Sequence, residues 1–118
     1  MAFRIAEHFV DVEFRCPCCG QLEFSRVLLG KLDHLRNRLG VPLYVTSGFR
    51  CEKYNNLIKG SKDSQHMLGK AADVCTTLAL VELLEAANEV GFMGIGVYPK
   101  KHFLHLDVRD TPARWTVN

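Results

Sequence analysis

The chain has 118 residues, which is room for one modest hydrophobic core but not for two. Apolar residues make up 47% of it and the formal net charge is only +2, so the composition argues against a disordered chain and against a nucleic-acid-binding surface. We therefore expect one globular domain over residues 1–118, acting as a monomer. No apolar run has the length of a signal peptide or of a membrane span.

The first predicted helix starts after Ser25 as N-cap and continues to about Leu39, where Gly40 ends it. Its apolar residues recur at intervals of three and four: Val27, Leu28, Leu32, Leu35 and Leu39. A short strand over 43–47 follows Pro42. Next come a helical stretch over 51–58 and a polar loop over 60–65 that leads to His66.

Residues 70–75 read as a strand whose alternation places Ala71, Asp73 and Cys75 on one face. A helix over 78–90 follows, with an apolar spacing of Val81, Leu84, Ala87 and Val90 before Gly91 ends it. Strands over 94–98 and 103–109 form a hairpin around the turn at 99–101. In the second of these strands His105 and Asp107 share a face. The single tryptophan, Trp115, is expected to cover an edge of the core.

Imidazoles and carboxylates in two segments form a candidate metal site. His66, Asp73 and His105 combine nitrogen and oxygen ligands in a set that suits zinc. If the strand with Asp73 lies beside the strand with His105, these two side chains converge and His66 completes the triangle from its loop. Three protein ligands leave a fourth position for water, which is typical of catalytic rather than structural zinc.

Five cysteines are many for this length, and three lie in the run Cys16-Pro17-Cys18-Cys19-Gly20. The spacing resembles half of a zinc knuckle, but no second half follows at the usual distance. Cys51 and Cys75 are possible partners in space. Free thiols, a structural metal and a disulfide remain open, while a nucleic-acid-binding zinc module is disfavoured because the basic residues are scattered.

Several strings in the chain match one known family. They are Thr46-Ser47-Gly48-Phe49-Arg50-Cys51, the following Asn55 and Gly60, Ser64-x-His66-x-x-Gly69-x-Ala71-x-Asp73, Gly96-x-Tyr98 and Phe103-x-His105-x-Asp107. Through them nearly the whole chain resembles the M15 zinc peptidases, which include D-alanyl-D-alanine carboxypeptidases and phage endolysins and share their fold with the hedgehog signalling domain. The resemblance implies a small α+β domain, with a mainly antiparallel sheet and helices on one face. It also implies that His66, Asp73 and His105 bind Zn²⁺.

The resemblance suggests further roles in the site. Arg50 would bind substrate or stabilise the developing oxyanion, and Ser64 would hydrogen-bond a ligand or the substrate. Where many members carry an acidic general base, three residues before the last ligand, this chain has His102. Asp107 is the rival base or an orienting residue, and a third alternative makes Asp107 a zinc ligand and His105 the base.

The expected function is zinc-assisted hydrolysis of the peptide stem of peptidoglycan, either as a D-alanyl-D-alanine carboxypeptidase or as an L,D- or D,D-endopeptidase. The alternative is a non-catalytic module that holds zinc and serves in cell-wall binding or phage assembly. We expect synthesis in the cytoplasm and action at the cell wall, reached by phage lysis, on a virion or by another export route.

Overall fold

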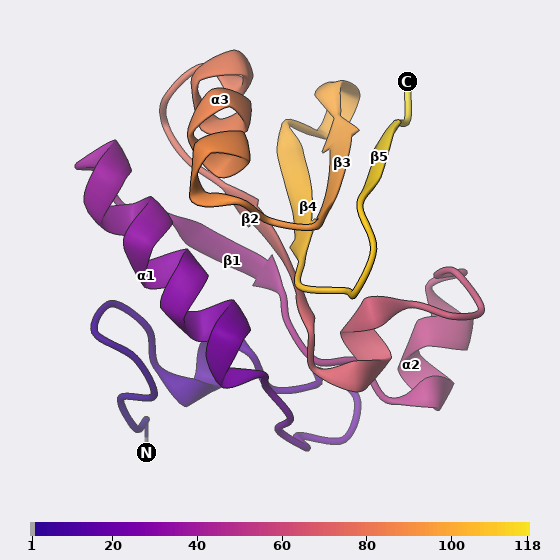
Figure 1. Ribbon diagram of the computed structural model, residues 1–118. Helices are drawn as coiled ribbons and strands as arrows, with labels where there is room; N and C mark the ends of the chain where they lie inside the picture. The colour runs from indigo at the N-terminus through magenta and orange to yellow at the C-terminus, as the bar shows by residue number, and fades with distance from the viewer. Residues whose placement is uncertain (1) are drawn as a thin grey trace.

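A five-stranded sheet organises the protein, and its strands lie in the order β1-β2-β4-β3-β5 (Figure 1). The computed structural model describes residues 2–118. The strands are β1 (Tyr44–Ser47), β2 (Ala71–Cys75), β3 (Gly94–Tyr98), β4 (Phe103–Asp107) and β5 (Ala113–Thr116). Neighbouring strands pair antiparallel except β3 and β5, which pair parallel. The predicted α+β class with a mainly antiparallel sheet is therefore confirmed.

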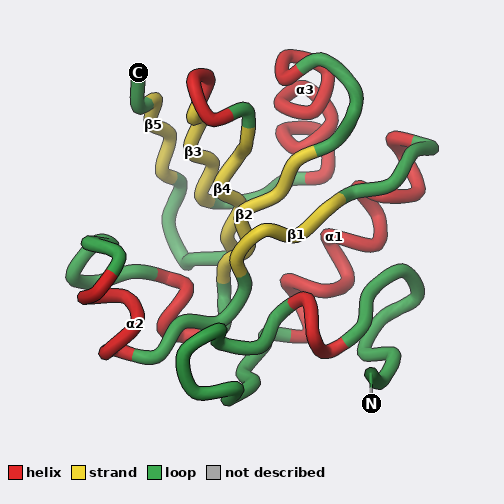
Figure 2. The backbone as a smooth tube through the Cα atoms, turned by 180° about the vertical axis from the view of Figure 1, so that it is seen from behind, coloured by secondary structure: helices red, strands yellow, loops and turns green. Residues whose placement is uncertain are grey.

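Two helices, α1 (Arg26–Leu39) and α3 (Leu80–Val90), cover one face of the sheet (Figure 1). The short helix α2 (Glu52–Leu57) lies on the other side of the sheet, away from α1, as Figure 2 shows from behind. Three 3₁₀ helices span Asp11–Glu13, Gln65–Leu68 and Pro99–Lys101. Within residues 2–118, no helix combines the length and the apolar character needed to cross a membrane.

The ends of α1 follow the signals in the sequence. Ser25 Oγ accepts a hydrogen bond from the backbone N–H of Leu28, and Gly40 ends the helix with a φ of 71°, which glycine adopts without strain. The apolar face is rotated from the predicted one, because Leu28, Leu29, Leu32 and Leu35 are buried whereas Val27 is exposed. In α3 the same correction applies to Val81, which is exposed while Leu83 is buried. Both helices carry more apolar residues than one face holds. The spacing of apolar residues alone therefore could not predict which of them are buried.

The sheet separates its residues by strand alternation. Val74, Leu104, Leu106 and Ile95 are completely buried against the helices, together with Phe9, Phe14 and Phe92. The opposite face carries a row of five directly paired residues, one from each strand: Ser47, Asp73, His105, Gly96 and Trp115. A bulge between Val45 and Ser47 brings Ser47 opposite Asp73 and completes this cross-strand row.

Strand β5 was not predicted from the sequence. Its four residues alternate between half-buried and exposed and follow the turn signal at Pro112, which leaves too short a pattern to identify. The pairing with β3 places Trp115 on the face that carries Asp73 and His105. The expectation that Trp115 covers an edge of the core was therefore wrong.

The rotated face of α1 gives a direct test of core packing. Leu32→Ala should lower the free energy of unfolding by about 2–5 kcal/mol, because the residue is completely buried and its truncation leaves a cavity. Val27→Ala, on the exposed face, should change it by less than about 0.5 kcal/mol. Urea denaturation of the two variants measures the difference, and equal losses would contradict the assignment of faces.

Candidate metal centre

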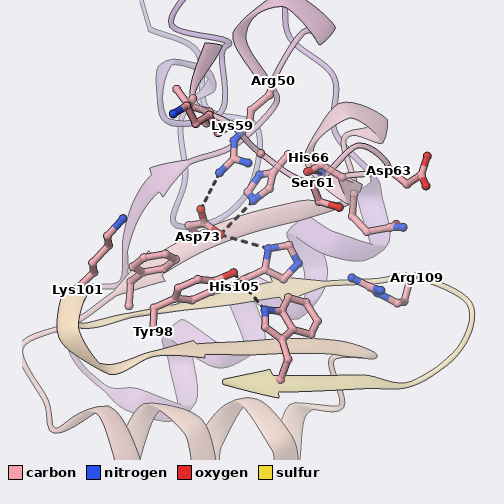
Figure 3. Close-up of a pocket in the computed structure, with 16 residues that line it drawn as sticks. Arg50, Lys59, Ser61, Asp63, His66, Asp73, Tyr98, Lys101, His105 and Arg109 are labelled. Carbon is pink, nitrogen blue, oxygen red and sulfur yellow. Dashed lines mark hydrogen bonds and ion pairs between the residues drawn. The ribbon is translucent and has the colours of Figure 1, made fainter. Parts of the chain in front are cut away.

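Three side chains from different elements converge above the sheet (Figure 3). Asp73 on β2 lies directly opposite His105 on β4, and His66 extends from the 3₁₀ helix over Gln65–Leu68. Asp73 Oδ1 lies 3.1 Å from His66 Nε2 and 3.3 Å from His105 Nδ1. All three residues are buried, with at most 7% of their surface exposed. The predicted convergence of Asp73 and His105 is thus confirmed by the register of the sheet.

Each imidazole is oriented by a partner on the side away from this centre. His66 Nδ1 lies 2.7 Å from the carbonyl oxygen of Gly48, and His105 Nε2 lies 2.6 Å from Asp107 Oδ2. Because both partners only accept hydrogen bonds, these two ring nitrogens carry the protons of the neutral rings. The other two ring nitrogens then present lone pairs toward Asp73 Oδ1. Three lone pairs that face one another call for a shared cation, so the geometry fits a metal ion.

Arg50 closes the side of Asp73 that faces away from the imidazoles. Its Nη2 donates to Asp73 Oδ2 at 2.9 Å, and its Nε donates to Ser47 Oγ at 3.0 Å. In the metal-free protein burial alone would raise the pKa of Asp73. Its hydrogen bonds with His105 and His66, formed when these rings carry a proton where the metal would bind, outweigh burial and hold this pKa well below the usual range. Asp73 is therefore ionised, and because its Oδ2 is already paired with Arg50, Oδ1 is the atom left for a metal ion.

Asp107 lies behind His105 and is completely buried. Besides His105, it accepts hydrogen bonds from Arg109, whose Nη2 lies 2.6 Å from Oδ2. These two partners outweigh the effect of burial and lower the pKa of Asp107. Gly94 opposite leaves the space for this carboxylate, since a Cβ there would collide with it. Asp107 is thus placed to orient His105, which is one of the roles expected for it, and not to be a ligand in place of His105.

The remaining predicted residues lie in different positions. Ser64 is buried and its Oγ accepts a hydrogen bond from the backbone N–H of His66 at 3.2 Å, so it caps the 3₁₀ helix that carries this ligand. His102 is exposed at the end of the Pro99–Lys101 turn and does not line the pocket. The structure therefore does not bring His102 together with the three candidate ligands.

An open pocket of about 710 Å³ lies over the centre. Its cationic side chains are Arg50, Lys59, Lys101 and Arg109, and its aromatic ones are Tyr98, Phe103 and Trp115. The centroids of the Trp115 and His105 rings are 5.0 Å apart, and Trp115 Nε1 donates a hydrogen bond to Tyr98 Oη at 3.1 Å. The sequence interpretation gave no pocket role to Tyr98, Arg109 or Trp115. Alternation over the predicted strand 103–109, which also places Arg109 on the face of His105, was the one available signal for it.

Comparison with known proteins agrees with this geometry. A family profile described as Peptidase M15 matches residues 5–107. The chain is also 33% identical over 95 residues to curated relatives named peptidoglycan L,D-endopeptidase MepK, from Escherichia coli strain K12, E. coli O157:H7 and Shigella flexneri. Each match covers 74% of this chain and 51% of the relative. The chain thus spans about half the length of the curated relatives it matches.

Replacing Asp107 should weaken zinc binding. In Asp107→Asn the acceptor for the His105 Nε2 proton is lost as a charged group, so the affinity for zinc should fall on the order of 10- to 100-fold. Competition with a chromophoric chelator measures this affinity. Asp110→Asn, at an exposed position three residues after the end of β4, is the matched control and should bind zinc like the wild type.

Without metal, stability should pass through a maximum between about pH 4 and about pH 6.5. The lowered pKa values of Asp73 and Asp107 contribute stability above the unfolded carboxyl value, and this is lost as the pH falls through their folded values. Burial alone would lower the pKa of His105, but Asp107 and Asp73 raise it, so its contribution is lost as the pH rises through the folded value. Melting temperatures of chelator-treated protein test this profile, and a steady rise in stability toward alkaline pH would contradict it.

Proposed function

The chain belongs to the peptidase M15 family, and from this premise we propose that it is a zinc-dependent peptidase that cuts the peptide stem of bacterial peptidoglycan. The observation that carries the proposal is the buried centre at which His66, Asp73 and His105 direct three lone pairs to one point. Among the possible bonds we favour an internal L,D cut, because the relatives at 33% identity are named L,D-endopeptidases. Its action would take place at the cell wall.

The ion would be held by His66 Nε2, His105 Nδ1 and Asp73 Oδ1. Zinc bound there would supply Lewis-acid activation of water and of the scissile carbonyl. The protein contributes the orientation of its ligands: the Gly48 carbonyl and Asp107 hold the two imidazoles in one tautomer each. Arg50 pairs with Asp73 Oδ2, the oxygen that would not bind the ion, and it also lines the pocket. It therefore acts first as a positioning residue. Contact of Arg50 with substrate stays a prediction.

The charge of the pocket supports a substrate rich in carboxylates. Lys59 and Lys101 bring positive charge to its walls against the one carboxylate of Asp63, since Arg50 and Arg109 are already paired with Asp73 and Asp107. Stem peptides carry free carboxylates along their length, which such walls would attract. Trp115 adds a flat apolar surface beside His105. A short peptide that lies across the sheet face would therefore meet cationic groups at its acidic side chains and the indole next to the scissile bond.

The non-catalytic alternative also has an observation in its favour. Neither residue expected as general base is placed for that task, because His102 is exposed outside the pocket and Asp107 is paired with His105 and Arg109 behind the ligand. A metal centre without a proton acceptor would suit a module that binds the cell wall through the same cationic pocket.

Mass spectrometry of purified muropeptides separates the two functions. Zinc-loaded protein should cut the stem internally, and Asp73→Asn or a chelator should reduce the cut to background, because both remove the metal. His34→Ala, at an exposed position on α1, is the matched control for histidine loss and should remain fully active. Release of a single terminal alanine would instead identify a carboxypeptidase.

If folded, zinc-bound protein returned every muropeptide intact, the peptidase proposal would fail. Retention of muropeptides by that protein, weakened by Lys59→Ala and Lys101→Ala together, would then support the binding module.

A further inference from the structure

A second group of metal-binding side chains lies outside the pocket. The Sγ atoms of Cys16, Cys19 and Cys51 all lie within 4.8 Å of one another, although Cys51 is more than 30 residues away in the chain. No cysteine lines the pocket above His66, Asp73 and His105. The cluster is therefore separate from the centre already described, and it uses residues whose pairing the sequence left open.

The spacing of the thiols matches tetrahedral metal coordination. Cys16 Sγ and Cys51 Sγ are 3.6 Å apart. Four thiolates at about 2.3 Å from a zinc ion stand about 3.8 Å from one another, whereas the sulfurs of a disulfide are about 2.05 Å apart. A disulfide would also use only two of the three thiols and leave the third beside it. The convergence of three sulfurs is what a metal requires.

The backbone around the cluster is arranged as a metal-binding loop. Two hydrogen bonds close the segment 16–21, from Cys16 N–H to the Gln21 carbonyl and from Gly20 N–H to the Cys16 carbonyl. Gly20 has a φ of 75°, which allows the tight turn. Cys16 Sγ also accepts a hydrogen bond from the backbone N–H of Cys51 at 3.4 Å. Such N–H donors aimed at sulfur favour the thiolate form that binds metals.

We propose that Cys16, Cys19 and Cys51 bind a structural zinc ion, with Cys18 as the fourth ligand. Cys18 is exposed and adjacent to Cys19 in the chain, so its thiol can complete the set of four. Cys75 is not part of the site, because it lies at the far end of β2 opposite Tyr44. A closed set of four thiolates leaves no position for water and is typical of structural zinc.

The position of this site links it to the candidate metal centre. Phe49 N–H donates to the Phe14 carbonyl at 2.8 Å, and Gly48 packs so closely on Phe14 that a Cβ would collide with its backbone. Zinc held by Cys16 and Cys51 would pin these two segments together at one end. The Gly48 carbonyl that orients His66 and the Arg50 that pairs with Asp73 both belong to the segment that ends in Cys51. The cysteine zinc would thus stabilise the loop that positions the first centre.

Cobalt substitution reads the cysteine site independently of the function of the pocket. Co²⁺ added to reduced, metal-free protein should give the intense near-ultraviolet absorption of thiolate-to-cobalt charge transfer, which a site of two histidines and one aspartate does not produce. Elemental analysis of zinc-loaded wild type should find two zinc ions per chain, and Asp73→Asn should retain the one at the cysteines. Cys19→Ser and Cys51→Ser should abolish the charge-transfer band, while Cys75→Ser should leave it unchanged.

Cys19 is exposed, so Cys19→Ser removes a ligand without a change in the core and keeps the test valid if Cys51→Ser does not fold. Wild-type protein under reducing conditions that shows no charge-transfer band and binds no zinc beyond the one lost in Asp73→Asn would overturn the proposal. A chain isolated with a Cys16–Cys51 disulfide that bound no second zinc after reduction would overturn it as well. Failure of the muropeptide experiment would leave these readouts unaffected.

Discussion

The register of the sheet is the constraint on which the site depends. One row of paired residues crosses all five strands and brings Ser47, Asp73, His105, Gly96 and Trp115 side by side. A slip of one residue between β2 and β4 would turn His105 into the core and expose Leu104 or Leu106 on the polar face. The same apolar burial that stabilises the fold therefore holds the candidate ligands opposite each other.

Small residues leave the space that the larger side chains of this sheet face occupy. Gly96 lies between His105 and Trp115, and a Cβ there would meet the indole ring, so glycine permits the ring to lie against the imidazole. In the neighbouring row Asp107 is flanked by Ala71 and Gly94, and this space lets a carboxylate stand completely buried behind His105. The geometry of the candidate metal centre thus depends as much on the small neighbouring residues as on the candidate ligands.

Charge alternates through the buried groups. Arg50 pairs with Asp73, Asp73 faces both imidazoles, His105 contacts Asp107, and Asp107 pairs with Arg109. Buried ions are costly unless they are paired, and here each carboxylate has a cationic partner on the side away from the centre. Each ligand atom that faces the centre is consequently held in place before a metal arrives. The cysteine cluster adds a second point of order at the other end of the loop that carries Gly48 and Arg50.

The amino-acid sequence by itself determined most elements of the fold and the candidate ligands. Ser25 and Gly40 mark the ends of α1, strand alternation puts Asp73 and His105 on polar faces, and the strings around His66 identify the family, because all of these are local signals in spacing and residue type. Only the tertiary structure decided which face of each helix is buried and that Trp115 joins the site through β5. It also decided that His102 stays outside the pocket and that Cys51, not Cys75, meets Cys16. These outcomes rest on contacts between residues distant in the chain, and such contacts are set by how the elements pack and not by any pattern within one of them.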